Sequence, residues 1–103
     1  MSFRRAARTD SNQTEIVAAF RKAGATVKLV HTVKGFVDAV VGINGRNLLI
    51  EIKDGSKPPS ARKLTGDEGD FHRKWKGTID IVESVDDVAR VLAKLHQRAG
   101  IDN

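Results

Sequence analysis

Two carboxylates and an amine are spaced along the chain so that strand geometry would bring them together: Asp38, Glu51 and Lys53. Between them lies Asn44-Gly45, a pair typical of two-residue hairpin turns because both central residues need positive φ. With these two residues as the turn, counting back along the two strands puts Asp38 directly opposite Glu51. Side chains opposed in this way share one face of a sheet, with Cβ atoms roughly 5 Å apart.

The chemistry that suits this arrangement is hydrolysis assisted by a metal ion. Like charges placed opposite each other repel, so the pairing of Asp38 with Glu51 makes physical sense mainly when a divalent cation lies between them. Lys53 follows Glu51 by two residues and therefore points to the same face. Two carboxylates and an amine on one patch are what metal-assisted hydrolysis of a phosphodiester needs.

Composition limits the class of protein. The chain has 103 residues, no cysteine and a net charge of +5. This length predicts one domain that can bury a modest core without disulfides. The lack of cysteine fits a reducing compartment, and no apolar run approaches the roughly 20 residues needed to cross a bilayer, so we expect a soluble, cytoplasmic protein without a membrane partner. The positive charge favours an anionic partner, with nucleic acid the leading candidate, because phosphate contacts dominate such binding.

The elements that must position these residues follow from the hydrophobic pattern. We expect a basic, flexible arm over residues 1–9 and a single domain over residues 10–103. Three helices are expected: one over residues 12–23, one from a Thr65–Glu68 capping box to Gly77, and one from Ser84, with Asp87 in its capping box, toward Gly100. Strands are expected over residues 26–31, 36–42, 47–53 and 78–82. The predicted fold class is α/β, a single domain in the order αβββαβα with a mixed central sheet flanked by helices.

Three short pieces of the chain, together with this order of elements, carry a resemblance to a known family. They are Gly35-Phe36-Val37-Asp38, Leu49-Ile50-Glu51-Ile52-Lys53 and Leu64-Thr65. In these pieces the chain resembles the PD-(D/E)XK nuclease superfamily, which implies a restriction-endonuclease-like core. The likeness is greatest to small phage-type members of the VRR-NUC and Holliday-junction-resolvase group, and it spans roughly residues 12–82.

Three further positions bear on the resemblance. Glu15, in the first expected helix, matches the acidic residue that many of these nucleases carry there. Val37 stands where the family motif has proline, a position on which no chemistry rests. Glu68 stands where related sequences commonly have glutamine, whose role is to hold DNA or water near the site. The simplest interpretation of Glu68 is the reciprocal member of the capping box.

The resemblance implies a role for each residue of the patch. Asp38 and Glu51 would bind Mg²⁺ or Mn²⁺ together with the backbone carbonyl of Ile52, as hard oxygen ligands favour. The alternative is a solvated sheet face that carries two unrelated acids. Lys53 would orient or help deprotonate the attacking water and offset charge in the transition state. Alternatively, Lys53 forms a simple ion pair with one of the two carboxylates. Glu15 is either a further catalytic acid or an ordinary first-turn acid favoured by the helix dipole.

A dense basic region follows the expected active strand. Its members are Lys57, Arg62, Lys63, Arg73, Lys74 and Lys76. They would contact the phosphates of a nucleic acid without recognising its base sequence. Alternatively, the run is only a solvated face, as such runs commonly are. The aromatic residues Phe71 and Trp75 are expected to anchor the core. For His72 both a surface position and a place facing DNA stay open.

The function that these observations predict is a metal-dependent endonuclease that hydrolyses DNA phosphodiester bonds and is selective for branched or junction DNA. A homodimer is expected, because one small domain leaves little surface to clasp a branched substrate. The alternatives are a catalytically inactive nucleic-acid-binding module of the same fold and an accessory protein that is basic for solubility alone.

Overall fold

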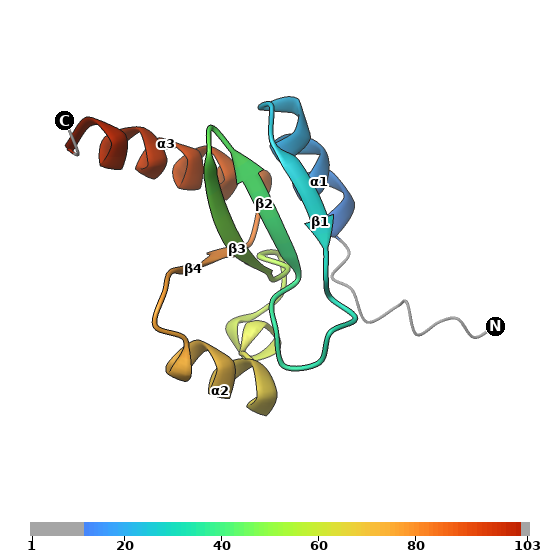
Figure 1. The fold of residues 1–103 in the computed structure, drawn as a ribbon. Coiled ribbons are helices and arrows are strands. Elements are labelled where there is room, and N and C mark those ends of the chain that lie inside the picture. Colours follow the sequence, from blue (N-terminus) through green and yellow to red (C-terminus); the bar gives the residue numbers. More distant parts are fainter. Residues whose placement is uncertain (1–11, 102–103) are drawn as a thin grey trace.

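The computed structural model describes the backbone of residues 12–101 and the side chains of this range, other than those of residues 61 and 96–101. The arm expected over residues 1–9 lies outside the described residues. The elements follow the expected order (Figure 1): α1 (Gln13–Lys22), β1 (Thr26–Leu29), β2 (Ala39–Ile43), β3 (Arg46–Ile52), the 3₁₀ helix η2 (Pro59–Arg62), α2 (Gly66–Lys74), β4 (Ile79–Val82) and α3 (Val85–Ile101). The α/β class and the αβββαβα order are therefore confirmed. None of the helices that the structure describes is both long and apolar enough to span a membrane.

The four strands form one mixed sheet in the order β1-β2-β3-β4. Strands β1 and β3 are antiparallel to β2, whereas β4 runs parallel to β3. The turn between β2 and β3 is the predicted one, because Asn44 has φ 51° and Gly45 has φ 75°. Ile43 pairs with Arg46 across it, so the predicted register is confirmed along the whole ladder.

The core lies between one face of the sheet and the helices α1 and α3. Ile16 and Phe20 of α1 and Val91 of α3 pack there against Ile50 and the other inward-facing strand residues, all of them buried. Because successive strand residues point to opposite faces, the residue after Ile50 points away from this core. That residue is Glu51, and the face to which it points is the one on which α2 lies (Figure 1).

Strand β2 begins later than expected, at Ala39 and not at Phe36. The ring of Phe36 instead packs edge-on against Phe71 of α2, with ring centroids 5.3 Å apart. Phe36 therefore lies against α2, while Asp38 still makes backbone hydrogen bonds to Val30 and Ile50 on either side.

Helix α2 begins as predicted and ends early. Thr65 and Glu68 form both hydrogen bonds of the capping box. The helix ends at Lys74, three residues before Gly77, and it has no buried residue. The expectation that Trp75 anchors the core is wrong, because Trp75 follows the helix end and is 43% exposed.

The start of α3 also differs from the expected capping box. The carboxylate of Asp87 accepts a hydrogen bond from the backbone N–H of Glu83 at 2.8 Å, one residue before the expected partner, Ser84. The interaction therefore ties the first turn of α3 to the end of β4.

Candidate active site

The carboxylate pair forms at the point where β2 and β3 separate. Asp38 directly precedes β2, and its Oδ2 accepts a hydrogen bond from the backbone N–H of Ile52 at 2.7 Å. The β2–β3 register ends with Ala39 opposite Ile50, so the next position on each strand brings Asp38 beside Glu51. The predicted juxtaposition is therefore present, and one oxygen of Asp38 is already used to hold the two strands together.

Glu51 is held in an environment that disfavours its charged form. The residue is 1% exposed, beneath α2. Burial, together with the charge of Asp38 and a hydrogen bond to it, raises the pKa of Glu51 from an ordinary 4.5 to about 9. The positive charge of Lys53 lowers this pKa but does not offset the other effects. The positive charge near Asp38 and Glu51 is therefore too small to stabilise both side chains in their ionised form.

Lys53 points to the same patch, as predicted, but pairs with a third acid. Its Nζ lies 2.8 Å from Oε1 of Glu68, and its side chain is only 12% exposed. The same Oε1 accepts the backbone N–H of Thr65 in the capping box, also at 2.8 Å. Burial alone would raise the pKa of Glu68, but these hydrogen bonds and the charge of Lys53 outweigh it and leave the pKa below its ordinary value. Glu68 is therefore both a capping residue and part of the site.

His72 is the second residue of α2 that reaches the site. Its Nε2 lies 3.4 Å from Oε1 of Glu51, and burial lowers the pKa of the imidazole, so the ring is mainly neutral at pH 7. Residues four apart on a helix share one face, so Glu68 and His72 together cover the carboxylates. Sequence reasoning did not place either residue over Glu51, because their spacing indicates only that they share a face of the helix and not what that face covers.

Glu15 lies elsewhere on the surface. It is exposed on α1 and lines a hollow of about 590 Å³ together with Asp54, Glu83 and Asp86, among others. Among the described residues, the groups that act on Glu51 are Asp38, Glu68, Lys53 and the imidazole of His72. The structure therefore does not bring Glu15 into contact with the carboxylate pair.

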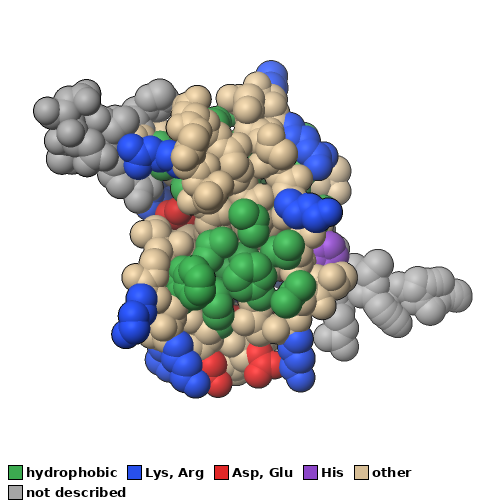
Figure 2. All heavy atoms as spheres, viewed as in Figure 1, with side chains coloured by type: hydrophobic (Ala, Val, Ile, Leu, Met, Phe, Trp, Pro, Cys, Tyr) green, Lys and Arg blue, Asp and Glu red, His purple; other side chains and the backbone are tan. Residues whose placement is uncertain are grey.

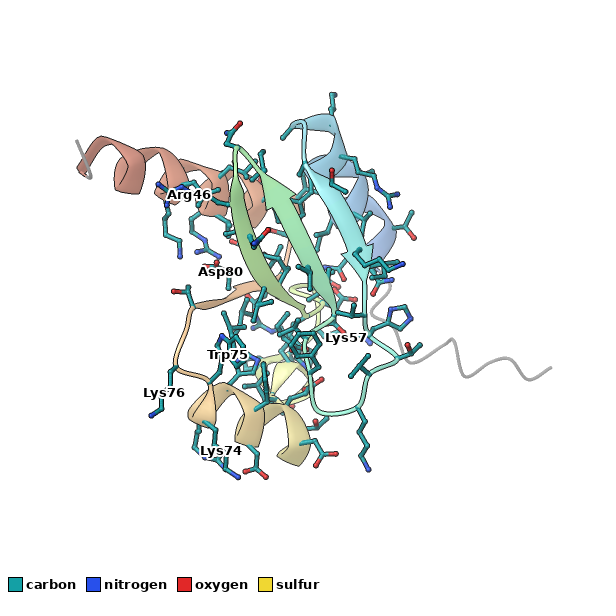
Figure 3. All side chains as sticks on the ribbon, in the orientation of Figure 1. Arg46, Lys57, Lys74, Trp75, Lys76 and Asp80 are labelled. Atoms are coloured by element: carbon teal, nitrogen blue, oxygen red, sulfur yellow. The ribbon has the colours of Figure 1, made fainter. Side chains whose placement is uncertain are left out.

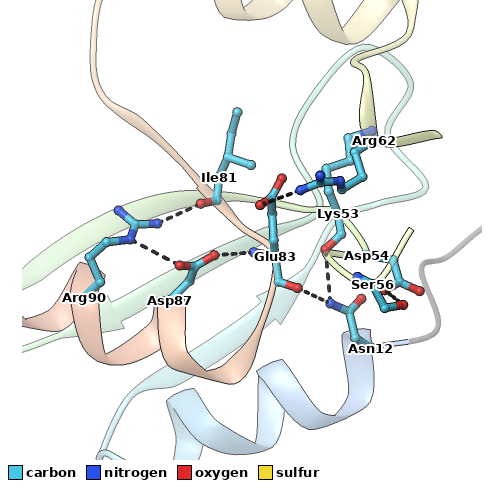
Figure 4. A network of polar contacts seen from close by, with 9 residues as sticks. All are labelled: Asn12, Lys53, Asp54, Ser56, Arg62, Ile81, Glu83, Asp87 and Arg90. Atoms are coloured by element: carbon cyan, nitrogen blue, oxygen red, sulfur yellow. Dashed lines mark hydrogen bonds and ion pairs between the residues drawn. The ribbon is translucent and has the colours of Figure 1, made fainter. Parts of the chain in front are cut away.

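The backbone of the site is fixed by the first residue of the described chain. Asn12 Nδ2 donates hydrogen bonds to the carbonyl of Lys53 at 3.1 Å and to that of Glu83 at 2.9 Å (Figure 4). Nearby, Arg62 forms an ion pair with Glu83 at 3.0 Å. These contacts hold the ends of β3 and β4 side by side, so the backbone that carries Lys53 is anchored from two elements.

The predicted basic residues divide into two groups. Arg62 and Arg73 form ion pairs, with Glu83 and Asp70 respectively. The four lysines of the region are exposed: Lys57, Lys63, Lys74 and Lys76. Figure 3 shows Lys74 and Lys76 near the end of α2.

The donor set of the site suits a hard divalent cation. Asp38 and Glu51 supply carboxylate oxygens, and Ile52, whose N–H bonds to Asp38, follows Glu51 with a backbone carbonyl; oxygen donors of this kind are what Mg²⁺ and Mn²⁺ prefer. Among the described residues, no group of three or more His, Cys, Asp or Glu side chains is arranged to hold a metal ion. A cation bound here would therefore have two carboxylates as its protein side-chain ligands and would complete its shell with backbone oxygen and water.

Comparison with known proteins adds no relative. No protein-family model, no curated protein and no solved structure matches this chain.

Proposed function

We propose that this protein is a metal-dependent endonuclease that hydrolyses phosphodiester bonds in DNA. The observation that carries the proposal is the position of Asp38 beside Glu51, with Glu51 almost fully buried and its pKa raised to about 9. Two carboxylates in such a place repel each other unless a cation or a proton lies between them. A bound divalent cation would relieve the repulsion that the fold imposes.

Each residue of the site has a task in such a reaction. Asp38 and Glu51, with the carbonyl of Ile52, would hold Mg²⁺ or Mn²⁺, which supplies positive charge where negative charge develops on the phosphoryl oxygens. Lys53 would orient the attacking water and stabilise that developing charge from the protein side. Glu68 holds the lysine amine in place through its 2.8 Å contact.

A second candidate is a nucleic-acid-binding module in which the site does not turn over. The burial of Glu51 and the engagement of Lys53 by Glu68 favour it, because both groups are covered by α2. This candidate predicts binding with a steep dependence on salt and no cleavage with any divalent metal.

The deciding experiment is a cleavage assay on labelled linear, flap and four-way-junction DNA with Mg²⁺ or Mn²⁺. The variants Glu51→Gln and Lys53→Met are expected to reduce cleavage by about 10²-fold or more, the scale of losing a group that stabilises developing charge. Asp38→Asn is the corresponding change at the remaining residue of the site, and it is also expected to lose cleavage. Asp38→Ala is unsuitable, because it would leave the N–H of Ile52 without its acceptor.

The outcomes separate the candidates. Cleavage by the wild type that is lost in all three variants supports the endonuclease. Binding without cleavage of any substrate supports the binding module, and cleavage at the normal rate in Glu51→Gln would rule out the proposed site. Circular dichroism spectra that match the wild type are required of each variant.

We also propose that the protein acts as a homodimer, which would set two sites across a branched substrate. Light scattering with and without junction DNA tests this part. If the protein is a monomer under both conditions, the homodimer proposal is wrong and the proposal for the site is unaffected.

A further inference from the structure

A hollow of about 460 Å³ lies at the edge of the sheet, next to the candidate active site. It forms where β3 extends beyond the first residue of β4, so that the chain between α2 and β4 stands away from the sheet. Its walls include Leu48 and Leu49 of β3, Trp75 and Thr78 of the connecting segment, Asp80 of β4 and Leu95 of α3. This volume is within the range of roughly 300–1,000 Å³ that small-molecule sites occupy.

The aromatic wall of the hollow is held in position and remains open to solvent. Trp75 packs against Phe71 with ring centroids 5.2 Å apart and an angle of 32° between the rings. Its indole also lies against Gly77, where a Cβ atom would come within 2.8 Å of Nε1, so a side chain at that position would collide with the ring. Even so, Trp75 is 43% exposed. A fixed, exposed indole is a surface on which another flat ring can stack.

The polar wall of the hollow carries an acceptor that lacks a donor. Asp80 is 4% exposed, and its Oδ1 accepts a hydrogen bond from Lys94 at 2.7 Å. Its Oδ2 is buried, and no donor among the described residues reaches it. Asp80 pairs with the core residue Ile50 and bonds to Lys94 of α3, so its carboxylate lies on the core side of the sheet and closes the hollow from below without being open to a ligand.

Positive charge flanks the aromatic wall. Lys74 and Lys76 are the exposed neighbours of Trp75 in the chain, and Arg46 lies at the hollow from the start of β3 (Figure 3). Figure 2 shows an apolar patch between the sheet and α2 with lysine and arginine side chains at its margin. An apolar surface bordered by cations suits a ligand that combines flat rings with phosphate groups.

We infer that this hollow binds an unpaired nucleobase of a nucleic-acid strand. The base stacks on Trp75 and leaves its backbone phosphates to Lys74 and Lys76. Leu49 lies two residues before Glu51 on the same strand, about 7 Å along it, and points to the same face of the sheet. The inference rests on the proposed function and names its substrate class: DNA with unpaired nucleotides beside the scissile bond.

The chain itself offers the probe for a test. It has one tryptophan and no tyrosine, so its fluorescence reports on Trp75 alone. The full chain is titrated, in EDTA to prevent cleavage, with a single-stranded oligonucleotide and with a strand of the same length whose sugars carry no bases. We expect the fluorescence to be quenched by the strand with bases and not by the abasic strand. Equal quenching by both strands, or none by either, would overturn the inference.

Variants test the aromatic wall, with affinity measured by anisotropy of a labelled strand. Trp75→Leu is expected to weaken binding by between about fivefold and 150-fold, the usual contribution of one stacked base, and Trp75→Phe to restore part of it. Val85→Ala, at a similarly exposed apolar residue of α3, is the matched control and should bind as the wild type does. Unchanged affinity in Trp75→Leu would overturn the stacking.

Because these measurements need no turnover, base-dependent quenching without cleavage would support the hollow while removing the endonuclease. Cleavage without base-dependent quenching would support the endonuclease and overturn the inference about the hollow.

Discussion

At the scale of single residues, the candidate site is built from groups that oppose one another. Asp38 is restrained by the N–H of Ile52, and this places its negative charge beside Glu51. Glu51 cannot turn to water, because α2 covers it and the imidazole of His72 lies against its Oε1. The folded state is therefore less stable than it would be otherwise, because Glu51 must either stay protonated or keep a buried charge, and both have a cost in free energy. Such a cost is expected at functional sites, where a ligand relieves it.

A dependence of stability on pH follows from the raised pKa of Glu51. Between pH 4.5 and about pH 9 the unfolded chain releases the Glu51 proton while the folded chain keeps it. The free energy of unfolding should therefore fall as pH rises through this window, with a slope of at most about 1.4 kcal/mol per pH unit from this residue. Glu51→Gln removes the titrating group and should flatten the profile relative to the wild type. Urea unfolding of both proteins at pH 5, 7 and 9, in EDTA, measures the difference.

An identical slope in the two proteins would show that Glu51 is already ionised in the folded state. Asp67→Asn, at an exposed carboxylate of α2, is the control for the loss of an acidic side chain. A change of slope in Asp67→Asn as large as that in Glu51→Gln would show that the effect is not specific to Glu51.

At the scale of elements, the sequence predicted the sheet better than it predicted α2. The hairpin register followed from Asn44-Gly45, because few turns accept two residues of positive φ and the turn then determines every pair behind it. Helix α2 has no buried residue, so no apolar stripe could indicate where it lies. Its position depends on contacts between residues distant in the chain, such as Phe36 with Phe71 and Lys53 with Glu68.

The residues of the candidate site divide in the same way. Asp38, Glu51 and Lys53 could be found because strand alternation alone brings them to one face. The closure of the site by α2 and the exposure of Trp75 could not be found, since both depend on where a helix without core contacts comes to rest.

Helix α2 should open more readily than the helices that form the core. It contributes no buried side chain, whereas α1 buries Ile16, Val17 and Phe20. Elements with few buried apolar contacts open locally at a lower free energy than the whole molecule unfolds. We expect the backbone amides of residues 66–74 to exchange hydrogen at least about tenfold faster than those of residues 13–22, as mass spectrometry of peptic fragments would measure. Equal protection would indicate that α2 is fixed over the carboxylates and that a substrate would have to reach the site without its movement.

At the scale of the whole molecule, the two faces of the sheet differ in which helices cover them. One face is covered by α1 and α3 and holds the core, while the other carries the carboxylate pair and is covered only in part, by α2. The net charge of +5 is one that favours the approach of a polyanion from any direction. If the proposed DNA binding holds, the exposed lysines at the end of α2 would give it a preferred place, beside both the candidate active site and the hollow.

The dependence of DNA affinity on salt should reveal which face binds. Each phosphate contact that a lysine makes contributes about 0.9 to the slope of log affinity against log salt concentration for duplex DNA, and about 0.7 for single strands. Replacing both Lys74 and Lys76 with alanine should therefore lower the magnitude of the slope by about 1.8 for a duplex and by about 1.4 for a single strand. Replacing Arg21 and Lys22 of α1 removes the same charge from the covered side of the sheet and should leave the slope nearly unchanged. Fluorescence anisotropy at several salt concentrations measures both variants. Equal losses of slope would mean that DNA is attracted by net charge alone and has no preferred face on this molecule.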